Sequence, residues 1–434
     1  MATQAVAAPP SLLEMMVEPQ SIADTGLDLG FITDLVLKVV YFNSGVTAQA
    51  IADTLCLPFF NIVDKALTAL KREELVEVGG SNGFGELAYQ YAITVKGMNR
   101  VHDVLARSAY VGPAPVTLDE YRQVVAAQAI ADVHVGPADV RKALADLVLD
   151  DFTIDCIGQA VNTGRSMFLY GPPGNGKTSL AEYIAKLLGG GIFIPAALVV
   201  DGHVIKVLDS HNHVPLPPPR LAGTTSRLTA HDQRWVYCQR PVIIVGGELT
   251  LASLDLVYDE ANKFYQAPLQ VKANGGLFLI DDFGRQQVSP HELLNRWIVP
   301  LEKRLDYLTM HTGKKIEVPF DQLIVFSTNL EPRSLVDDAF LRRIQNKIKI
   351  NNPTVDQYRE IFRRQCQALG VPYNNEGLIY LLKEYYVKTK RDLRACHPRD
   401  ILRQLIGIAR YKGVPPAMTA ELIDMACKTY FADL

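Results

Sequence analysis

The chain has 434 residues, of which 48% are apolar and 21% are charged, and its formal net charge is -3. The length exceeds what one hydrophobic core usually organises, so we expect two or three domains, and the composition excludes a mostly disordered chain. The near balance of charges excludes a generally basic coat for nucleic acid, although a local basic patch stays open. No apolar run approaches the ~20 residues of a membrane helix.

The six cysteines are scattered singly, without the paired spacing of metal ligands. This usage favours reduced thiols, and the first apolar stretch has no basic segment before it. Together these features predict a cytoplasmic protein with no insertion into a membrane.

Residues 1–25 are rich in Ala, Pro and Ser and are expected to be mobile. Residues 26–110 change to alternating helical and strand patterns, which predict a small N-terminal winged helix-turn-helix domain. Its expected helices cover residues 31–41 and start at the cap Thr47 and at Pro58, and its expected strands cover residues 75–78 and 89–94.

The charge of this domain bears on what it binds. From Gly30 to Tyr110 the sequence holds seven basic and eight acidic residues. Binding to duplex DNA relies on phosphate contacts from Lys and Arg, and a near-neutral domain supplies few of them. The presumed recognition helix begins with Phe59 and Phe60, which suit a protein surface better than a groove edge. Docking to a protein is therefore favoured, while contact with DNA stays open.

A linker, residues 111–134, precedes the segment that carries the chemistry. It begins with a stiff Gly-Pro-Ala-Pro run at residues 112–115 and is expected to hold one helix at residues 118–130. The following stretch, residues 135–350, is predicted to be an α/β nucleotide-binding core.

A phosphate-binding loop follows a short apolar strand candidate at residues 166–170. Its glycines let successive backbone N–H groups turn toward a phosphate, its lysine offers a charge to the β- and γ-oxygens, and its threonine offers a hydroxyl to Mg²⁺. The helix expected at residues 179–188 points its positive N-terminal end at the same phosphates. The residues predicted to bind the nucleotide here are Gly171, Pro172, Pro173, Gly174, Asn175, Gly176, Lys177, Thr178 and Ser179.

Two carboxylates follow a fully apolar strand candidate at residues 277–280, of the kind that is buried on both faces of a parallel sheet. Open α/β sheets bind ligands at the carboxyl ends of their strands. Asp281 is expected to hold Mg²⁺ together with Thr178, and Asp282 to orient or deprotonate the attacking water. The next buried strand ends in Asn329, which can hydrogen-bond a water or the γ-phosphate.

Two adjacent arginines, Arg342 and Arg343, close a helix candidate that begins near Asp338. They are either a solvated helix end or charges that are presented to the γ-phosphate held by a neighbouring subunit.

These motifs together resemble those of the AAA+ ATPase superfamily, from residue 135 to the C-terminus. The phosphate-binding loop is similar to its Walker A motif. The other matching positions are Asp281 and Asp282 for the Walker B motif, Asn329 for sensor 1, Arg342 and Arg343 for the arginine fingers, and Arg399 for sensor 2.

The branch of the superfamily stays unassigned. Most members carry Asp-Glu where this chain has Asp281 and Asp282. Because Asp282 has a shorter side chain than glutamate, the identity of the catalytic base stays open. Asp-Asp before Phe-Gly is similar to bacterial helicase loaders and transposase-helper ATPases. Residues 273–276 and 293–295 instead resemble branches with added hairpins, which include enhancer-dependent transcription activators and MoxR-like chaperones.

The resemblance implies a P-loop NTPase core with a parallel sheet, an α-helical lid at residues 351–434, and ATP and Mg²⁺ as cofactors. It also implies a homo-oligomeric ring, commonly a hexamer, in which the next subunit's Arg342 or Arg343 completes each ATP site. An arginine supplied in this way can be worth ~10³ or more in rate. The chain is thus expected to be a chaperone-like ATPase that remodels an unknown protein client. The alternatives are a DNA-associated loader that uses the winged helix, and a slow nucleotide-dependent assembly switch.

The sequence of residues 189–277 gives fewer indications of structure and function. An Asp-Gly turn predicts a hairpin at residues 199–205, a second hairpin is expected at 234–245, and a proline-rich stretch near 214–219 is expected to be extended. Phe264 and Tyr265 are either pore-lining aromatics or packing at a sheet edge. Four histidines in or near this stretch have no firm metal-ligand spacing. The lid is expected to hold helices at 355–369, 376–387, 399–410 and 420–431.

Overall fold

The computed structural model of the chain describes residues 10–219 and 231–431. Its internal contacts divide the chain into two units. The first unit consists of Met1–Val133, Leu188–Phe278 and Glu292–Leu323, and the second of His134–Leu187, Leu279–His291 and Ile324–Leu434. Each of the two units combines segments that are distant in the sequence, whereas the domains predicted from the sequence are continuous segments. The predicted domain boundaries therefore stay predictions. Over the described ranges, no helix has both the length and the apolar character needed to cross a bilayer.

The first unit combines a helical part with several small sheets. Its helices are α1 (Pro10–Met15), α2 (Leu29–Phe42), α3 (Ala48–Leu55), α4 (Asp64–Arg72), α5 (Val95–Arg107), α6 (Leu118–Ala127), α10 (Leu269–Lys272) and α12 (Ile298–Lys303). Its strands are β1 (Val46–Thr47), β2 (Val76–Ser81), β3 (Tyr89–Ile93), β4 (Val116–Thr117), β6 (Gly191–Pro195), β7 (Ala197–Val200), β8 (His203–Lys206), β9 (Trp235–Gln239), β10 (Val242–Val245), β11 (Val257–Asp259), β12 (Phe264–Gln266), β14 (Leu305–Thr309) and β15 (Lys315–Pro319).

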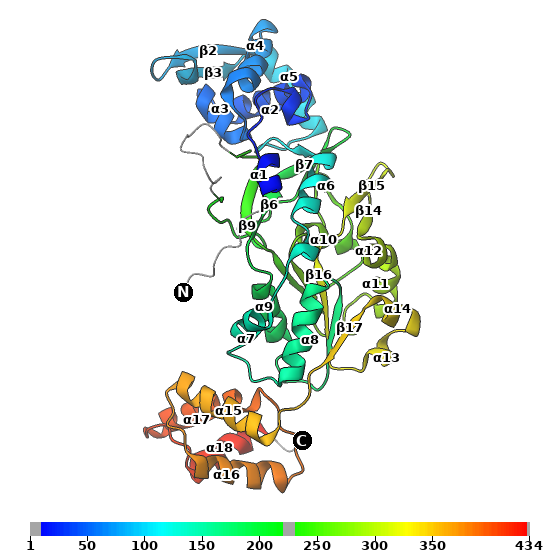
Figure 1. Cartoon of the computed structure of the whole chain (residues 1–434). Helices are drawn as coiled ribbons and strands as arrows, with labels where there is room; N and C mark the ends of the chain where they lie inside the picture. The colour runs from blue at the N-terminus through cyan, green and yellow to red at the C-terminus, as the bar shows by residue number, and fades with distance from the viewer. Residues whose placement is uncertain (1–9, 220–230, 432–434) are drawn as a thin grey trace. The chain divides into compact units, whose positions relative to one another are not determined.

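The helical part packs α2 to α5 with an antiparallel sheet of order β1–β3–β2 (Figure 1). The predicted cap Thr47 accepts a hydrogen bond from the Ala50 N–H at 3.2 Å and starts α3. One side of α2 supplies much of the core, because Ile32, Val36 and Val39 are all fully buried there.

The third helix begins later than Pro58 predicts. Phe60 has φ -67° and ψ 137°, and Asn61 has φ 66°, so α4 starts only at Asp64. Asparagine tolerates the left-handed region better than most residues, which lets the chain turn here. The turn keeps Phe59 buried and leaves Phe60 61% exposed.

The β-rich part contains a sheet of order β11–β12–β8–β7–β4, and the hairpin predicted at the Asp-Gly turn is confirmed as β7 and β8. The hairpin predicted at residues 234–245 is wrong. β9 pairs instead with β6, antiparallel from Trp235 opposite Pro195 to Gln239 opposite Gly191. Pro241, which lies between β9 and β10, has no N–H group to offer to a hairpin ladder.

The N-terminal segment differs from the mobile stretch expected at residues 1–25. Residues 1–9 lie outside the described residues, but residues 10–25 contain α1 and a short 3₁₀ turn. Leu12 and Met16 are 1% and 2% exposed and join a core with strands β6 to β9. The Asp232 N–H also donates to the Met16 carbonyl at 2.8 Å, so a long-range contact orders this segment.

The second unit contains the loop and strands singled out from the sequence. Its elements are α7 (Pro137–Ala143), α8 (Asp151–Asn162), β5 (Met167–Tyr170), α9 (Lys177–Leu187), α13 (Pro332–Leu335), α14 (Asp338–Arg343), β17 (Asn346–Lys349), α15 (Val355–Leu369), α16 (Asn375–Leu382), α17 (His397–Lys412) and α18 (Ala420–Tyr430). Three further elements cross the limits of the units: β13 (Leu277–Ile280), α11 (Pro290–Arg296) and β16 (Leu323–Thr328).

One sheet positions the candidate site, with β13, β16, β5 and β17 in this order. β5 pairs in parallel with both β16 and β17. The fold is therefore mixed α/β with parallel pairing around the strand that precedes the phosphate-binding loop, and α8 packs beside β17 (Figure 1). Helices α15 to α18 have a core of their own, which includes Tyr358, Phe362 and Leu402.

Candidate nucleotide-binding site

The phosphate-binding loop connects β5 with α9, in the order that the sequence predicts. Gly171, Gly174 and Gly176 have φ values of 133°, 80° and 77°, a region that side chains other than glycine rarely adopt. A Cβ on Gly171 would lie 2.3 Å from the Ile350 carbonyl oxygen, so the loop also needs glycine for close packing. The N-terminal end of α9, at Lys177, directs its partial positive charge into this loop.

Lys177 points back into the loop and is only 6% exposed. Its amine donates to the carbonyl oxygens of Gly171 at 3.0 Å and Pro172 at 3.1 Å, and to Asn329 Oδ1 at 2.7 Å. Burial lowers the pKa of the Lys177 amine, and the charges of Asp282 and Asp281 oppose that shift. A phosphate at this loop would offer the amine stronger acceptors than neutral carbonyl groups do.

Thr178 and Asp281 lie together, as expected for a shared metal site. The Thr178 hydroxyl donates to Asp281 Oδ2 at 2.8 Å. Hydroxyl and carboxylate oxygens are ligands that Mg²⁺ prefers, so the donor set fits this ion beside bound phosphates. Gln286 supports the strand end, since its side-chain amide donates to the Asp281 carbonyl at 2.8 Å.

Asp282 and Asn329 face each other across the ends of adjacent strands. Asn329 Nδ2 donates to Asp282 Oδ1 at 2.9 Å, while its Oδ1 accepts from Lys177. Because β16 lies between β13 and β5, Asn329 joins the carboxylate to the lysine of the loop. Asp282 is exposed and takes the left-handed conformation at φ 49°, which leaves its carboxylate accessible to water.

Asn175 has a role that sequence reasoning missed. It was expected to bind the nucleotide with the rest of the loop, but its side chain is 8% exposed and is engaged elsewhere. Its Nδ2 donates to Asn352 Oδ1 at 2.8 Å, and its Oδ1 accepts from the Ala395 N–H at 3.1 Å. The Cys396 N–H also donates to the Gly174 carbonyl at 2.9 Å. The loop is thus bonded to the residues before α15 and before α17.

A second lid arginine, Arg394, approaches the loop, so it joins the predicted Arg399 as a candidate to contact the nucleotide. Arg399 Nε donates to Asp400 Oδ1 at 2.9 Å, and this hydrogen bond raises the pKa of its guanidinium. Arg394 Cδ lies 3.5 Å from the position of a Cβ built on Gly174, so its stem lies over the loop. No sequence signal distinguishes the two, because the contact depends on how the segment before α17 folds.

Arg342 and Arg343 end α14, which Asp337 caps by accepting from the Phe340 N–H at 3.0 Å. Arg342 is exposed, and among the described residues no hydrogen bond or ion pair joins it to the phosphate-binding loop. The Arg343 guanidinium lies over the Phe340 ring at 5.7 Å. The two arginines therefore differ in how free they are to move.

The two aromatic candidates of residues 189–277 are used for packing, and one of the four histidines, His213, is buried. Tyr265 is 1% exposed in a core, and Phe264 packs against the core of the helical part, which is the edge-packing alternative. His213 is 1% exposed, accepts from the Asp209 N–H at 2.9 Å, and donates to the Lys272 carbonyl at 2.9 Å.

Comparisons with known proteins add sequence and structural matches. A family model described as a domain of unknown function (DUF8689) matches residues 354–429, which hold α15 to α18. No curated protein matches the chain in sequence.

Among solved structures, a point mutant of RuvB from Thermotoga maritima is similar at 12% identity and a TM-score of 0.37, with 70% of this chain and 73% of that chain covered. RuvB described as a Holliday junction branch migration motor is similar at 13% identity and 0.36, with 72% and 71% covered. NtrX from Brucella abortus in complex with ATP is similar at 14% identity and 0.38, with 83% and 63% covered. At these low identities and TM-scores, the residues of the site carry the functional argument.

Proposed function

We propose that the chain is an ATPase of the AAA+ superfamily that binds ATP with Mg²⁺ and hydrolyses it at the subunit boundaries of a homo-oligomeric ring. The observation that carries the proposal is the hydrogen-bonded chain from Lys177 through Asn329 to Asp282, beside the pair of Thr178 and Asp281. It unites a phosphate-binding cation, a group that can fix a water molecule, and a carboxylate that can accept its proton.

The residues divide the chemistry among themselves. Backbone N–H groups of the loop and the Lys177 amine would hold the β- and γ-phosphates. Thr178 and Asp281 would hold Mg²⁺, which neutralises charge on the phosphate oxygens. Asp282 would orient the attacking water and take its proton, and Asn329 would hold that water in line with the γ-phosphate. Arg342 or Arg343 of the next subunit would complete the site.

Replacing the loop lysine tests this proposal directly. Lys177→Ala should abolish binding of a fluorescent ATP analogue, because the buried cation that faces the phosphates is lost. Lys186→Ala is a matched control, since Lys186 lies on the same helix, is exposed, and lies 4.3 Å from the centroid of the Tyr183 ring. Wild-type affinity in the Lys177 variant would reject the assignment of this loop.

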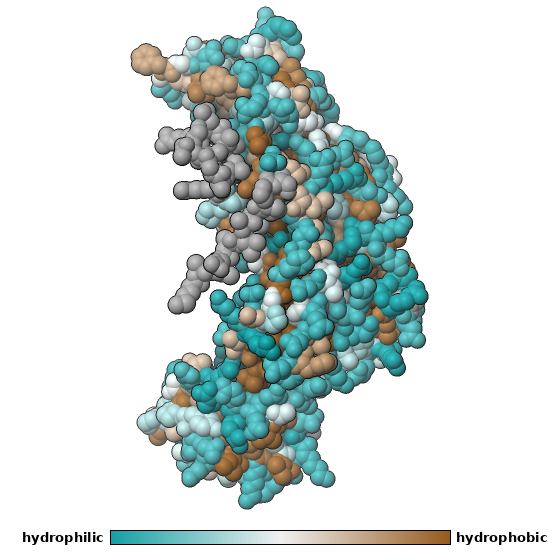
Figure 2. Space-filling model, in the orientation of Figure 1, coloured by the Kyte–Doolittle hydropathy of each residue, from teal (hydrophilic) through white to brown (hydrophobic). Residues whose placement is uncertain are grey.

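We further propose that residues 26–110 form a winged-helix-like adaptor that docks to a protein client. The supporting observation is a set of exposed apolar side chains on its strands, on the loop between β2 and β3, and on the turn before α4: Phe60, Val78, Phe84 and Tyr89. On the face shown in Figure 2 the surface is mainly hydrophilic, with apolar residues scattered over it, some single and some side by side. Exposed aromatic residues are enriched where proteins bind proteins.

The DNA-associated alternative rests on α4, which exposes Lys65, Lys71 and Arg72. Glu73 and Glu74 follow immediately, so this surface has little net positive charge. Retention of the full chain on random duplex DNA at rising salt separates the two, because each lost phosphate contact should reduce the salt slope by about 1. A slope that falls in a Lys65→Ala, Lys71→Ala variant would favour DNA, and no retention at low salt would favour the protein client.

Turnover measured at high protein concentration tests the slow assembly switch. A ring motor should hydrolyse ATP faster as the subunits assemble, because each site needs its neighbour. Assembly with ATP that is not followed by turnover would favour the switch.

A further inference from the structure

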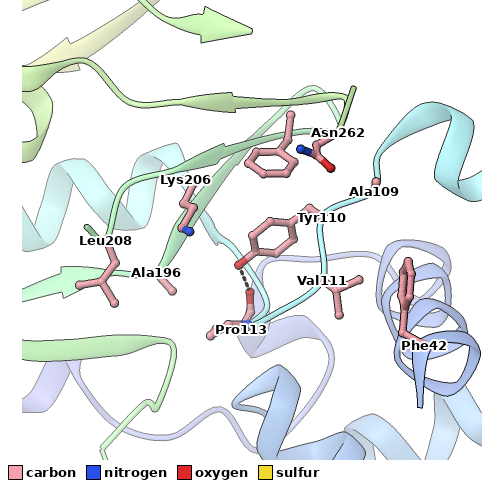
Figure 3. A pocket seen from close by; sticks show the side chains of 10 residues that line it. Phe42, Ala109, Tyr110, Val111, Pro113, Ala196, Lys206, Leu208 and Asn262 are labelled. Atoms are coloured by element: carbon pink, nitrogen blue, oxygen red, sulfur yellow. Dashed lines mark hydrogen bonds between the residues drawn. The ribbon is translucent and has the colours of Figure 1, made fainter. Parts of the chain in front are cut away.

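A cavity of about 500 Å³ lies in the first unit, away from the phosphate-binding loop in sequence and among residues that the proposed ATPase does not use. Its walls come from the end of α2, the segment 109–113, and strands β8 and β12. Figure 3 shows Ala196, Leu208 and Lys206 on one side of it, Phe42 on the other, and Tyr110 between them. Pockets of this size accept small organic ligands.

Besides the Tyr110 hydroxyl, the described residues of the lining include two polar side chains, and the others are apolar. Tyr110 is 6% exposed, and its ring meets that of Phe264 edge to face, with 5.8 Å between the centroids. The Tyr110 hydroxyl already donates to the Pro113 carbonyl at 2.7 Å, as Figure 3 shows, so it has no proton left for a ligand. Asn262 is the first polar side chain, and its Nδ2 already donates to Asp259 Oδ2 at 2.7 Å.

Lys206 is the second polar side chain and, among the described residues, the only charged one on the lining. Within the two described ranges, its amine makes no hydrogen bond or ion pair. Lys206 is exposed, and its amine stands at the edge of a cavity whose lining, as far as the described residues go, includes aromatic side chains and no acid. The cavity is therefore complementary in charge to one negative group and in polarity to an apolar body.

We propose that this cavity binds a small apolar acid, with its carboxylate on Lys206 and its aliphatic or aromatic body between Tyr110, Val111 and Leu208. A single amine matches a monoanion better than a phosphate, which usually recruits several donors. This inference is independent of ATP hydrolysis.

Calorimetric titration of the full chain with octanoate and with octanol tests the proposal, because the two probes differ only in the charged group. We expect saturable binding of both, with octanoate bound about fivefold more tightly, a modest preference because the amine is partly in water. Lys206→Met should abolish the preference and leave octanol binding unchanged, and Lys206→Arg should retain it. Lys142→Met, which removes an exposed lysine on α7, should behave as wild type.

A second variant locates the ligand. Val111→Glu places a carboxylate on the half-exposed wall of the cavity, which should repel the octanoate carboxylate and weaken octanoate more than octanol. The proposal would be overturned by equal affinity for the two probes in the wild type, by an unchanged preference in Lys206→Met, or by the lack of saturable binding.

Discussion

For single residues at the candidate site, the sequence indicates the chemical role but not the backbone conformation. The sequence places Asp282 after a buried strand, but not its φ of 49° or its hydrogen bond with Asn329. A left-handed aspartate costs free energy, and such residues gather where a carboxylate must be aimed. The proposed role of the Asp282 carboxylate as the base is therefore the first prediction to test.

Asp282→Asn should keep ATP binding and lose turnover by about 10²-fold or more, because an amide cannot accept the proton of the attacking water. Binding of the fluorescent ATP analogue and release of phosphate measure the two effects separately. Asp282→Glu restores a carboxylate and should recover part of the turnover. Unchanged turnover in the asparagine variant would remove Asp282 as the base.

The two lid arginines lead to opposite expectations. Arg394→Ala should raise the KM for ATP about fivefold or more, because its stem lies over Gly174 and its guanidinium can reach a phosphate on the loop. Arg399→Ala should change the KM little, because Arg399 is bonded to Asp400. Steady-state kinetics of both variants decide the assignment, and the reverse order of effects would return the role to Arg399.

At the scale of elements, the sequence predicts segments that local pattern alone defines. The strand, loop and helix around Lys177, the hairpin at Asp201 and Gly202, and the helices of the lid all depend on neighbouring residues and lie where expected. The pairing of β9 with β6 joins residues 40 to 48 positions apart, and no local pattern encodes it. The contacts of Asn175 with the lid are of the same long-range kind.

The lid contains a buried histidine whose protonation should control stability. His397 is 5% exposed at the start of α17, and its Nδ1 lies 2.9 Å from the Tyr386 hydroxyl. Burial lowers its pKa to about 4, and the charges of Arg394 and Arg391 act in the same direction. Since an unfolded histidine has a pKa near 6.5, the unfolded chain binds more protons between these values, and stability falls as pH falls.

We therefore expect the free energy of unfolding to fall by about 2 kcal/mol between about pH 7 and about pH 5 on account of this residue. Thermal unfolding of wild type and His397→Gln measures it: the variant should start less stable and lose less on acidification. His134→Gln, which replaces an exposed histidine, should follow the wild type. Parallel pH dependence in wild type and His397→Gln would contradict the expectation.

At the scale of the whole molecule, each ATP site of the proposed ring depends on a positive charge that the neighbouring subunit supplies. Lys177, Thr178, Asp281, Asp282 and Asn329 are brought together within one chain. Arg342 is exposed at the end of α14, whereas Arg343 lies over Phe340, so Arg342 is the better candidate to reach a neighbour. A site shared in this way has two halves that can be damaged separately.

Mixing two inactive variants tests that division. Arg342→Ala keeps an intact loop and Lys177→Ala keeps an intact arginine, so a boundary with the loop of the first and the arginine of the second is complete. In random rings formed from equal amounts, about a quarter of boundaries are of this kind, and turnover should recover to that order. Lys177→Ala mixed with Asp282→Asn should stay inactive, because both changes damage the same half of every site.

A further mixture shows whether a failure of turnover to recover reflects the absence of shared sites or the inactivation of whole rings by a damaged subunit. Lys177→Ala added to wild type should reduce turnover in proportion to its share of subunits if boundaries act independently. A proportional fall there, together with no recovery in co-assembled rings of Arg342→Ala and Lys177→Ala, would contradict a site completed by Arg342. Repeating the mixture with Arg343→Ala then decides whether the neighbouring arginine supplies the charge, since only the residue that crosses the boundary can be complemented by a partner with a damaged loop.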